Sequence, residues 1–139
     1  MAGRSRDIVL LGAERSTLGE IAASLAKERD REIGPDPTPN EGHFFRSDHF
    51  PLAKVGIPAL SLSDPVKFLT NVDAAKKRHE EYVANDYHQP SDEVKDWWDY
   101  SGAVEDMTFL AELGWRIANQ PEMPAYHAYE QFARPRLKQ

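Results

Sequence analysis

The stretch Asp7-Ile-Val-Leu-Leu-Gly12 limits the fold of this chain more than any other. Its apolar residues are consecutive and do not alternate with polar ones. This pattern is typical of a strand with both faces covered, as in a parallel sheet between layers of helices. The segment Thr17-Leu-Gly-Glu20 then has a capping-box pattern, in which the first and last side chains bond free amides at a helix start. A strand followed by a helix is therefore the first predicted unit.

Apolar residues continue at helical spacing after Thr17 and predict a helix with one buried face, extending to about Arg29. Prolines between residues 35 and 39 then predict an extended connector. A short helix is predicted next, capped by Ser47 or Asp48, because a proline falls in its first turn, where a missing amide costs little. Gly56 is predicted to end that helix.

One further strand is predicted at residues 57–62, Ile-Pro-Ala-Leu-Ser-Leu. Residues 64–85 carry only a thin apolar stripe, and residues 86–93 are typical of a loop. Ser101 is predicted to cap a long helix, since apolar residues recur after it at spacings of four and three. Strands separated by helices indicate an α/β fold with a parallel sheet. Two strands are few for such a sheet, so part of it is expected to lie elsewhere.

The composition excludes some classes of function. The chain has 139 residues and a formal net charge of -6, which argues against a nucleic-acid partner, since phosphates require a basic face. No apolar stretch is long enough to span a bilayer, so no membrane partner is expected. The first residues do not have the apolar region of a signal peptide. Hydrophobic residues make up 40% of the chain, enough for a packed core without disulfides.

Two segments place a histidine beside carboxylates and hydroxyls at the edge of a predicted element, where ligands bind in open α/β sheets. In residues 86–93, His88 follows a tyrosine and has carboxylates on both sides, so its imidazole is a candidate zinc ligand. The alternative is a surface histidine in a polar turn. In residues 45–60, His49 is either a site residue or a brace for its helix, bonded to Asp48 or to a backbone carbonyl.

Other patterns do not indicate a reaction. The chain contains no glycine-rich phosphate loop, no His-Glu-x-x-His and no Gly-x-Ser-x-Gly. The charged run at residues 76–81 is typical of a solvated helix face. His43, His79 and His127 have no supporting partner nearby in sequence and are interpreted as ordinary histidines.

The two histidine segments, in this order, resemble the C-terminal half of metallopeptidase family 28, which includes di-zinc aminopeptidases and glutaminyl cyclases. Arg46-Ser-Asp-His-Phe-Pro, followed by Gly-Ile-Pro-Ala-Leu60, is similar to the family's Ser-Asp-His stretch, helix and strand. Tyr87-His-Gln-Pro-Ser-Asp92 is similar to its Tyr-His-x-Pro-x-Asp loop. The strand after Gly3 and the long helix also fit, so the resemblance extends from about Gly3 to about Ala118.

The resemblance implies part of a three-layer αβα zinc-exopeptidase fold with a mainly parallel sheet. It implies two zinc ions with a bridging water that attacks the peptide carbonyl. His88 would be a metal ligand, and Tyr87 would donate a hydrogen bond to the oxyanion. Ser47, Asp48 and His49 would orient the metal ligands through hydrogen bonds without contacting the metal, or would line the substrate pocket.

Family members supply their other metal ligands and general base from segments before the strand that follows Gly3. We therefore expect this chain to be the C-terminal fragment of a zinc aminopeptidase, without the N-terminal strands and ligands, and inactive alone. Residues 1–120 would belong to the catalytic domain and residues 121–139 would form an irregular tail, with Tyr126, Tyr129 and Phe132 as anchors. The alternatives are a non-catalytic interaction or dimerisation module and an acyltransferase of the glutaminyl-cyclase kind.

Two further expectations follow from this interpretation. Residues that pack on missing strands would leave an open sheet edge, so the isolated chain is expected to self-associate through it. The parent enzyme would act on peptide substrates. The resemblance leans toward a periplasmic or secreted protein, although the sequence does not determine the compartment.

Overall fold

Residues 3–69 and 71–133, which the computed structural model describes, form a mixed α/β structure around one sheet. The sheet has three strands in the order β2-β1-β3. β1 (Asp7–Leu11) runs parallel to β2 (Glu32–Gly34) and antiparallel to β3 (Ser61–Ser63). The sheet is thus mixed, and the expected mainly parallel sheet is not what these strands form. Ser61, the first residue of β3, pairs with Leu11, the last residue of β1. β3 therefore runs back along β1 in the antiparallel direction.

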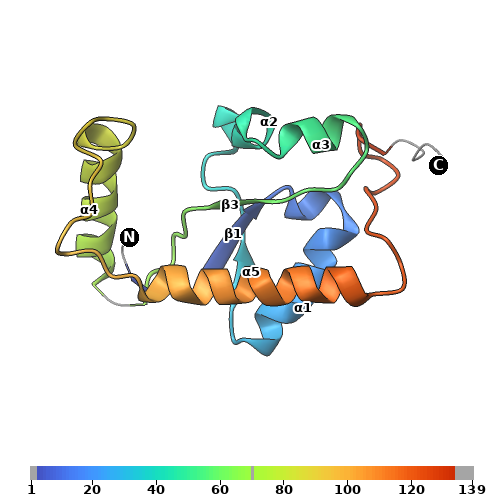
Figure 1. Ribbon diagram of the computed structural model, residues 1–139, viewed down its shortest axis with the longest axis horizontal. Coiled ribbons are helices and arrows are strands. Elements are labelled where there is room, and N and C mark those ends of the chain that lie inside the picture. Colours follow the sequence, from blue (N-terminus) through green and yellow to red (C-terminus); the bar gives the residue numbers. More distant parts are fainter. Residues whose placement is uncertain (1–2, 70, 134–139) are drawn as a thin grey trace.

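β1 is buried along its whole length, as its unbroken apolar run predicts. Ile8 and Leu10 belong to one hydrophobic core, and Val9 and Leu11 belong to a second. Because successive side chains of a strand point to opposite faces, the two cores lie on the two faces of the sheet. Figure 1 shows the corresponding layers, with α2 and α3 above the sheet and α5 below it.

The first core is formed with α1 (Thr17–Glu28) and α5 (Ser101–Asn119), which pack against each other. The sequence-based expectation for α1 is confirmed in extent and in its buried face. The predicted capping box is wrong, because no side chain of the described residues caps the helix. The hydroxyl oxygen of Thr17 instead accepts a hydrogen bond of 3.1 Å from the amide of Ala125, so the tail takes the place of the helix amide.

The second core is formed with α2 (His43–Arg46), α3 (Phe50–Lys54) and the segment after α5. Phe44, Tyr126 and Phe132 are its buried aromatic residues. Of the three aromatic anchors expected in the tail, Tyr129 is the exception, being 79% exposed. Two short 3-10 helices, η1 (Ala13–Arg15) and η2 (Pro39–Glu41), precede α1 and α2 respectively. Gly56 follows α3 with a φ of 81°, a conformation that suits glycine after a helix.

The side chain of Asp7 is fully buried and organises the chain after β3. Its carboxylate accepts hydrogen bonds from the amides of Val66 and Lys67, at 3.0 and 2.9 Å. The guanidinium of Arg31 donates to its backbone carbonyl at 2.7 Å. These bonds hold the residues after β3 alongside the start of β1, and they satisfy a carboxylate that would be costly to bury alone.

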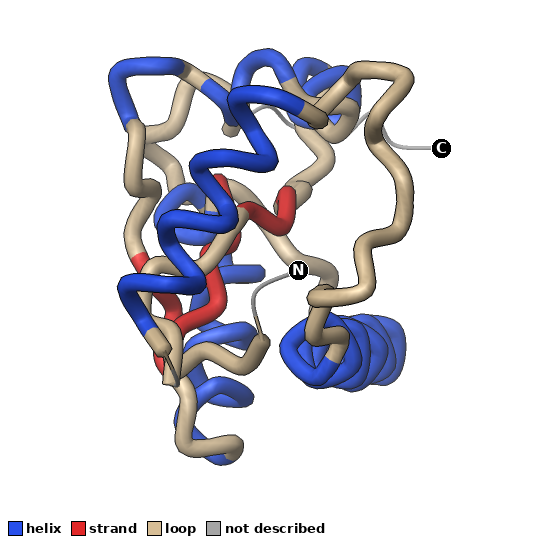
Figure 2. The backbone as a smooth tube through the Cα atoms, turned by 90° about the vertical axis from the view of Figure 1, so that its left-hand side faces the viewer, coloured by secondary structure: helices blue, strands red, loops and turns tan. Residues whose placement is uncertain are grey.

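The helix α4 (Val72–Asn85) stands apart from the two cores (Figure 1), and Ala75 is its one buried residue. The ambiguous residues 64–85 therefore contain a helix whose thin apolar stripe matches its slight burial. Figure 2 looks nearly along α5 and shows the long loop from α4 running back to the first turn of α5. Within residues 3–69 and 71–133, no helix combines the length and apolar character needed to cross a membrane.

Candidate functional site

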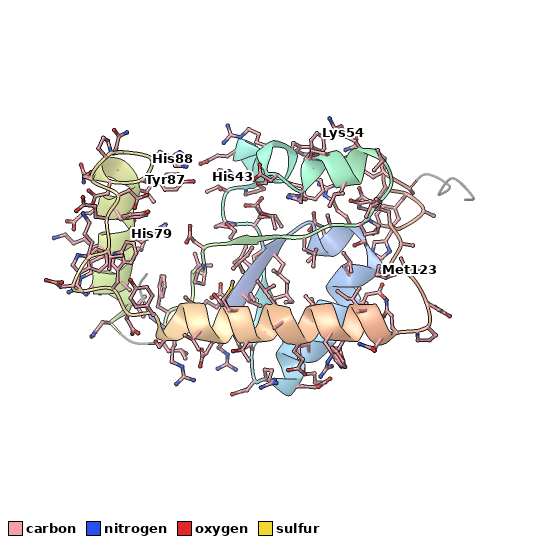
Figure 3. All side chains as sticks on the ribbon, in the orientation of Figure 1. His43, Lys54, His79, Tyr87, His88 and Met123 are labelled. Carbon is pink, nitrogen blue, oxygen red and sulfur yellow. The ribbon has the colours of Figure 1, made fainter. Side chains whose placement is uncertain are left out.

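The Tyr87-His88 pair lies in the loop just after α4, and both side chains are exposed. The backbone of His88 is left-handed, with a φ of 60°. Its ring stacks on the ring of Tyr87, with the centroids 3.8 Å apart and the planes at 22°. A left-handed non-glycine residue is uncommon, although histidine tolerates it better than most, and such residues gather at functional sites. In Figure 3 the two rings extend from the top of α4 on the side that faces α2.

Local bonds hold this loop in one shape. The amides of Asp86 and Tyr87 donate to the carbonyl of Tyr82 at the end of α4. The amine of Lys95 donates to the carbonyl of Ser91 at 2.8 Å and lies 3.5 Å from the carboxylate of Asp86. These bonds close the loop that carries His88 at both of its ends.

Tyr82 is the central residue of this loop. Its hydroxyl donates a hydrogen bond of 2.8 Å to the carboxylate of Asp92. That bond, together with desolvation, raises the pKa of Tyr82 from 10.0 to about 12. Its ring also makes an edge contact with Trp98, at a centroid distance of 6.0 Å. Asp92, the last residue of the Tyr-His-Gln-Pro-Ser-Asp motif, therefore braces the loop by accepting a hydrogen bond from Tyr82.

The residues of the Ser-Asp-His segment have three different environments. The hydroxyl of Ser47 donates to the carbonyl of His43, the first residue of α2, at 2.7 Å. The carboxylate of Asp48 is exposed. The ring of His49 lies edge-on against Phe44, at a centroid distance of 4.7 Å. Burial lowers the pKa of His49, so its neutral form is favoured.

His49 is the unsatisfied residue of this segment. Both ring nitrogens are buried, and neither has a hydrogen-bond partner within the described residues. The expected bond from His49 to Asp48 or to a backbone carbonyl is therefore wrong, because the ring turns inward against Phe44. Leaving a buried polar group unpaired costs roughly 1–3 kcal/mol, and each such group calls for an explanation.

The described residues do not bring the two segments together into one metal site. No hydrogen bond, ion pair or ring contact between described residues joins residues 47–49 to Tyr87 or His88. In the described parts of the chain, no three side chains from histidine, cysteine, aspartate and glutamate converge to hold a metal. A zinc site needs three or four ligands. The described residues therefore do not fit a zinc ion by themselves.

The remaining histidines, His43, His79 and His127, each lie near a carboxylate or an aromatic ring. The ring of His43 lies 3.0 Å from the carboxylate of Glu41. The ring of His79 lies 3.7 Å from the carboxylate of Asp64, which is distant in sequence. His127 stacks near Tyr129, with the ring centroids 5.4 Å apart. Figure 3 labels His43 and His79 together with the Tyr87-His88 pair.

A pocket of about 430 Å³ lies between the start of β1, the end of α1 and the first half of α5. Four arginines line it: Arg4, Arg6, Arg29 and Arg31. Three of these arginines pair with carboxylates of α5, namely Glu105, Glu112 and Asp106. Neither histidine segment lines this pocket.

The order of the Ser-Asp-His segment, the β3 strand and the Tyr-His loop on a mixed α/β fold is that of a peptidase domain. The family model described as Peptidase family M28 matches residues 1–111. The chain therefore belongs to this family. This match confirms the resemblance drawn from the two motifs. No curated protein and no solved structure matches the chain. Its function is thus related to peptidases, and the match ends within α5.

Sequence reasoning missed Tyr82 and Lys95 as residues that shape the loop. Tyr82 stands on a helix with few buried positions, and its partner Asp92 is ten residues away across a turn. The sequence did contain one signal for this bond, a tyrosine (Tyr82) and an acidic residue (Asp92) on either side of a predicted turn. Lys95 gives no such signal, since its two partners, Asp86 and the carbonyl of Ser91, are set by the turn itself.

Proposed function

We propose that this chain supplies the Tyr87-His88 loop to the active site of a zinc aminopeptidase, which removes N-terminal residues from peptides. Its membership of peptidase family M28 supports the general reaction, since peptidases of this family are generally zinc-dependent. The observation that carries the proposal is His88 itself. It is an exposed, left-handed residue held on a braced loop and stacked on the one tyrosine beside it.

In this proposal His88 provides one imidazole ligand, and a polypeptide segment other than this chain provides the others. Tyr87, which is 49% exposed, would donate a hydrogen bond from its hydroxyl to the oxygen of the peptide carbonyl as negative charge develops there. The stacked rings hold the hydroxyl and the imidazole in a fixed relation. Fixed donors contribute more to catalysis than mobile ones, because they do not reorganise during the reaction.

His49 would lie at the wall of the same site. An imidazole with two buried and unbonded nitrogens is explained if a partner from the rest of the site bonds it. Asp48, which is exposed beside it, would orient a metal ligand or a substrate amine. Ser47 would hold the segment in place through its bond to His43.

The chain alone is proposed to be inactive, because a single imidazole does not hold zinc with useful affinity. The test is hydrolysis of aminoacyl-nitroanilides by the purified chain with added zinc. We expect no turnover above the zinc blank. Robust turnover by the chain alone would overturn this part of the proposal.

The site assignment is tested by adding a segment of another member of the family that carries the remaining ligands. We expect zinc-dependent turnover with the unchanged chain. The variant His88→Ala should lose it, and Tyr87→Phe should lower kcat more than it changes KM. The matched control His79→Ala removes another histidine of the same region and should keep full turnover. Equal turnover by His88→Ala and His79→Ala would remove His88 from the site.

A further inference from the structure

A mostly buried ion pair joins η1 to the segment after α5. The Nη1 atom of Arg15 donates a hydrogen bond of 2.9 Å to the carboxylate of Glu130, and the two side chains are 21% and 13% exposed. Removing one partner from a pair shielded in this way leaves the other charge uncompensated. The amide of His127 also donates to the carbonyl of Arg15, at 3.0 Å. These two contacts hold residues 127–130 against η1.

The same guanidinium packs on the ring of Phe44 in α2. The central carbon of the Arg15 guanidinium lies 4.7 Å from the centroid of that ring and 5.6 Å from the centroid of Phe45. A guanidinium at such a distance is attracted to the face of the ring, and the attraction grows where water is excluded. Phe44 is only 5% exposed. Glu130 thus fixes the guanidinium, and the guanidinium contacts the buried ring directly.

The segment after α5 makes a second contact with Phe44 through an aromatic ring. The ring centroid of Phe132 lies 5.9 Å from that of Phe44 and 5.9 Å from that of Phe50. Aromatic rings at such distances attract each other beyond the area that they bury. Figure 1 shows this segment rising from the end of α5 to the level of α2 and α3. Phe44 is therefore held from the segment by one charged and one aromatic contact.

His49 depends on Phe44 for the direction of its ring. The two rings meet edge-on, with their centroids 4.7 Å apart and their planes at 69°. Neither nitrogen of His49 has a hydrogen-bond partner in residues 3–69 and 71–133. Since no hydrogen bond to a described residue fixes the imidazole, packing against neighbouring rings sets its direction. A shift of Phe44 would therefore move His49 as well.

We propose that three residues position His49 in the peptidase site by holding Phe44. They are Arg15, Glu130 and Phe132. The catalytic effect of this coupling rests on the proposed function, in which His49 lies at the wall of the site. The coupling itself does not depend on that function, because every contact lies within this chain. Glu130 and Phe132 lie beyond residues 1–111, the part of the chain that the family model matches.

The first test measures nuclear Overhauser effects between the rings of His49 and Phe44 in the chain alone. The effect should be clear in the unchanged chain and about twofold weaker in Glu130→Gln, because the guanidinium loses its charged partner. The matched control is Glu14→Gln. Glu14 lies 3.2 Å from the same guanidinium but is 68% exposed, so solvent screens its charge and the effect should not change. An unchanged effect in Glu130→Gln, or an equal weakening in both variants, overturns the coupling.

Two further variants keep the coupling testable if Glu130→Gln does not fold. Arg15→Lys keeps the positive charge but lacks the planar guanidinium that stacks on a ring. Phe132→Leu keeps an apolar side chain but removes the aromatic ring beside Phe44. Each variant should weaken the effect between His49 and Phe44, while the amide resonances of β1 stay those of the folded chain. A full effect in either folded variant would overturn the coupling.

The second test measures turnover after addition of the ligand-bearing segment of another family member. Displacing a group by a fraction of its working geometry lowers a rate strongly, so Glu130→Gln should lower kcat by about tenfold and change KM little. Glu14→Gln should keep the kcat of the unchanged chain. In a His49→Ala background, Glu130→Gln should lower kcat no further, because both changes then act through one residue. Additive losses would show that Glu130 does not act through His49, which overturns the proposal.

The two tests separate this coupling from the proposed function. Without turnover by the unchanged chain and the added segment, the proposed function fails, and the nuclear Overhauser effects still decide whether Glu130 orients His49. With turnover that is equal in Glu130→Gln and Glu14→Gln, the proposed function stands and the positioning role is overturned.

Discussion

Tyr82 shows how one side chain outside the recognised motifs sets the shape of the loop that carries His88. Its hydroxyl bonds Asp92, the final residue of the Tyr-His motif, and its ring packs edge-on against Trp98. His49 represents the opposite case, an imidazole whose two buried nitrogens bond no group in residues 3–69 and 71–133. The first residue completes its bonds within the chain, and the second has no hydrogen-bond partner among the described residues.

Ionisation of Tyr82 should release the loop. The pKa of Tyr82 is raised to about 12, so the folded state favours the neutral hydroxyl. The stabilising effect is therefore complete below pH 10.0 and is lost as the pH rises toward about 12. Near-ultraviolet tyrosinate absorbance should show this late ionisation in the unchanged chain and not in Tyr82→Phe.

Two further measurements separate the causes. Asp92→Asn keeps an acceptor but removes the charge, so the ionisation of Tyr82 should move back toward its ordinary pKa. Hydrogen exchange of the amides at residues 86–93 should be faster in Tyr82→Phe than in the unchanged chain. Identical exchange in the two proteins would show that the Tyr82–Asp92 bond does not order the loop.

At the scale of elements, the first turn, the middle and the last part of α5 contact different parts of the chain. Its first turn packs tightly against the N-terminal segment, since a Cβ on Gly102 would lie 2.0 Å from the carbonyl oxygen of Gly3. Its middle packs on β1 and α1. Its last part bonds α1, because Arg116 donates to the carboxylate of Glu28 at 2.8 and 2.6 Å. That exposed pair orients α5 on α1 and contributes little stability.

The two helical glycines of α5 should respond in opposite ways to alanine. Gly102→Ala should destabilise the chain by roughly 1–3 kcal/mol, because the new methyl group meets a backbone oxygen that has to move. Gly114→Ala should stabilise it by about 0.5–1 kcal/mol, because the space is open and alanine loses less conformational entropy in a helix. Urea unfolding at low protein concentration measures both. A gain in stability for Gly102→Ala would contradict the close packing of α5 on Gly3.

For the whole molecule, the segment after α5 closes the second core. Tyr126 and Phe132 pack there beside Phe44, although the stretch has no helix or strand in its described part. The amides of Thr17 and His127 bond the carbonyls of Ala125 and Arg15, which ties this segment to the start of α1. The boundary predicted at residue 120 stays a prediction, but residues 121–133 share a core with the preceding elements.

Truncation of one aromatic side chain in this segment should reveal its part in stability. Phe132, which is 8% exposed, should cost about 3 kcal/mol when changed to alanine, since a buried ring leaves a cavity. Tyr129→Ala is the matched control, and its effect should stay within about 0.5 kcal/mol because the ring is exposed. Thermal or urea unfolding measures both changes. Equal losses in the two variants would show that the segment is not part of the core.

The sequence by itself determined the elements whose cause is local. The apolar run of β1, the helical spacing in α1 and α5, the stop at Gly56 and the two family motifs all depend on residues close in the chain. Hydrophobic period and turn chemistry act over a few residues, so they can be read without the fold. The family was likewise visible in the order of the two motifs, and the match over residues 1–111 confirmed it.

Tertiary structure decided what depends on contacts between distant residues. The antiparallel direction of β3, the bond of Thr17 to the tail and the inward turn of His49 each require a partner far along the chain or a surrounding core. The same holds for α5, whose Val104, Met107 and Trp115 are exposed. Helical spacing predicts its apolar residues, but only packing shows which of them the sheet covers and which stay exposed. The burial of a side chain depends on how all the elements pack together, whereas hydrophobic periodicity depends only on residues close in the sequence.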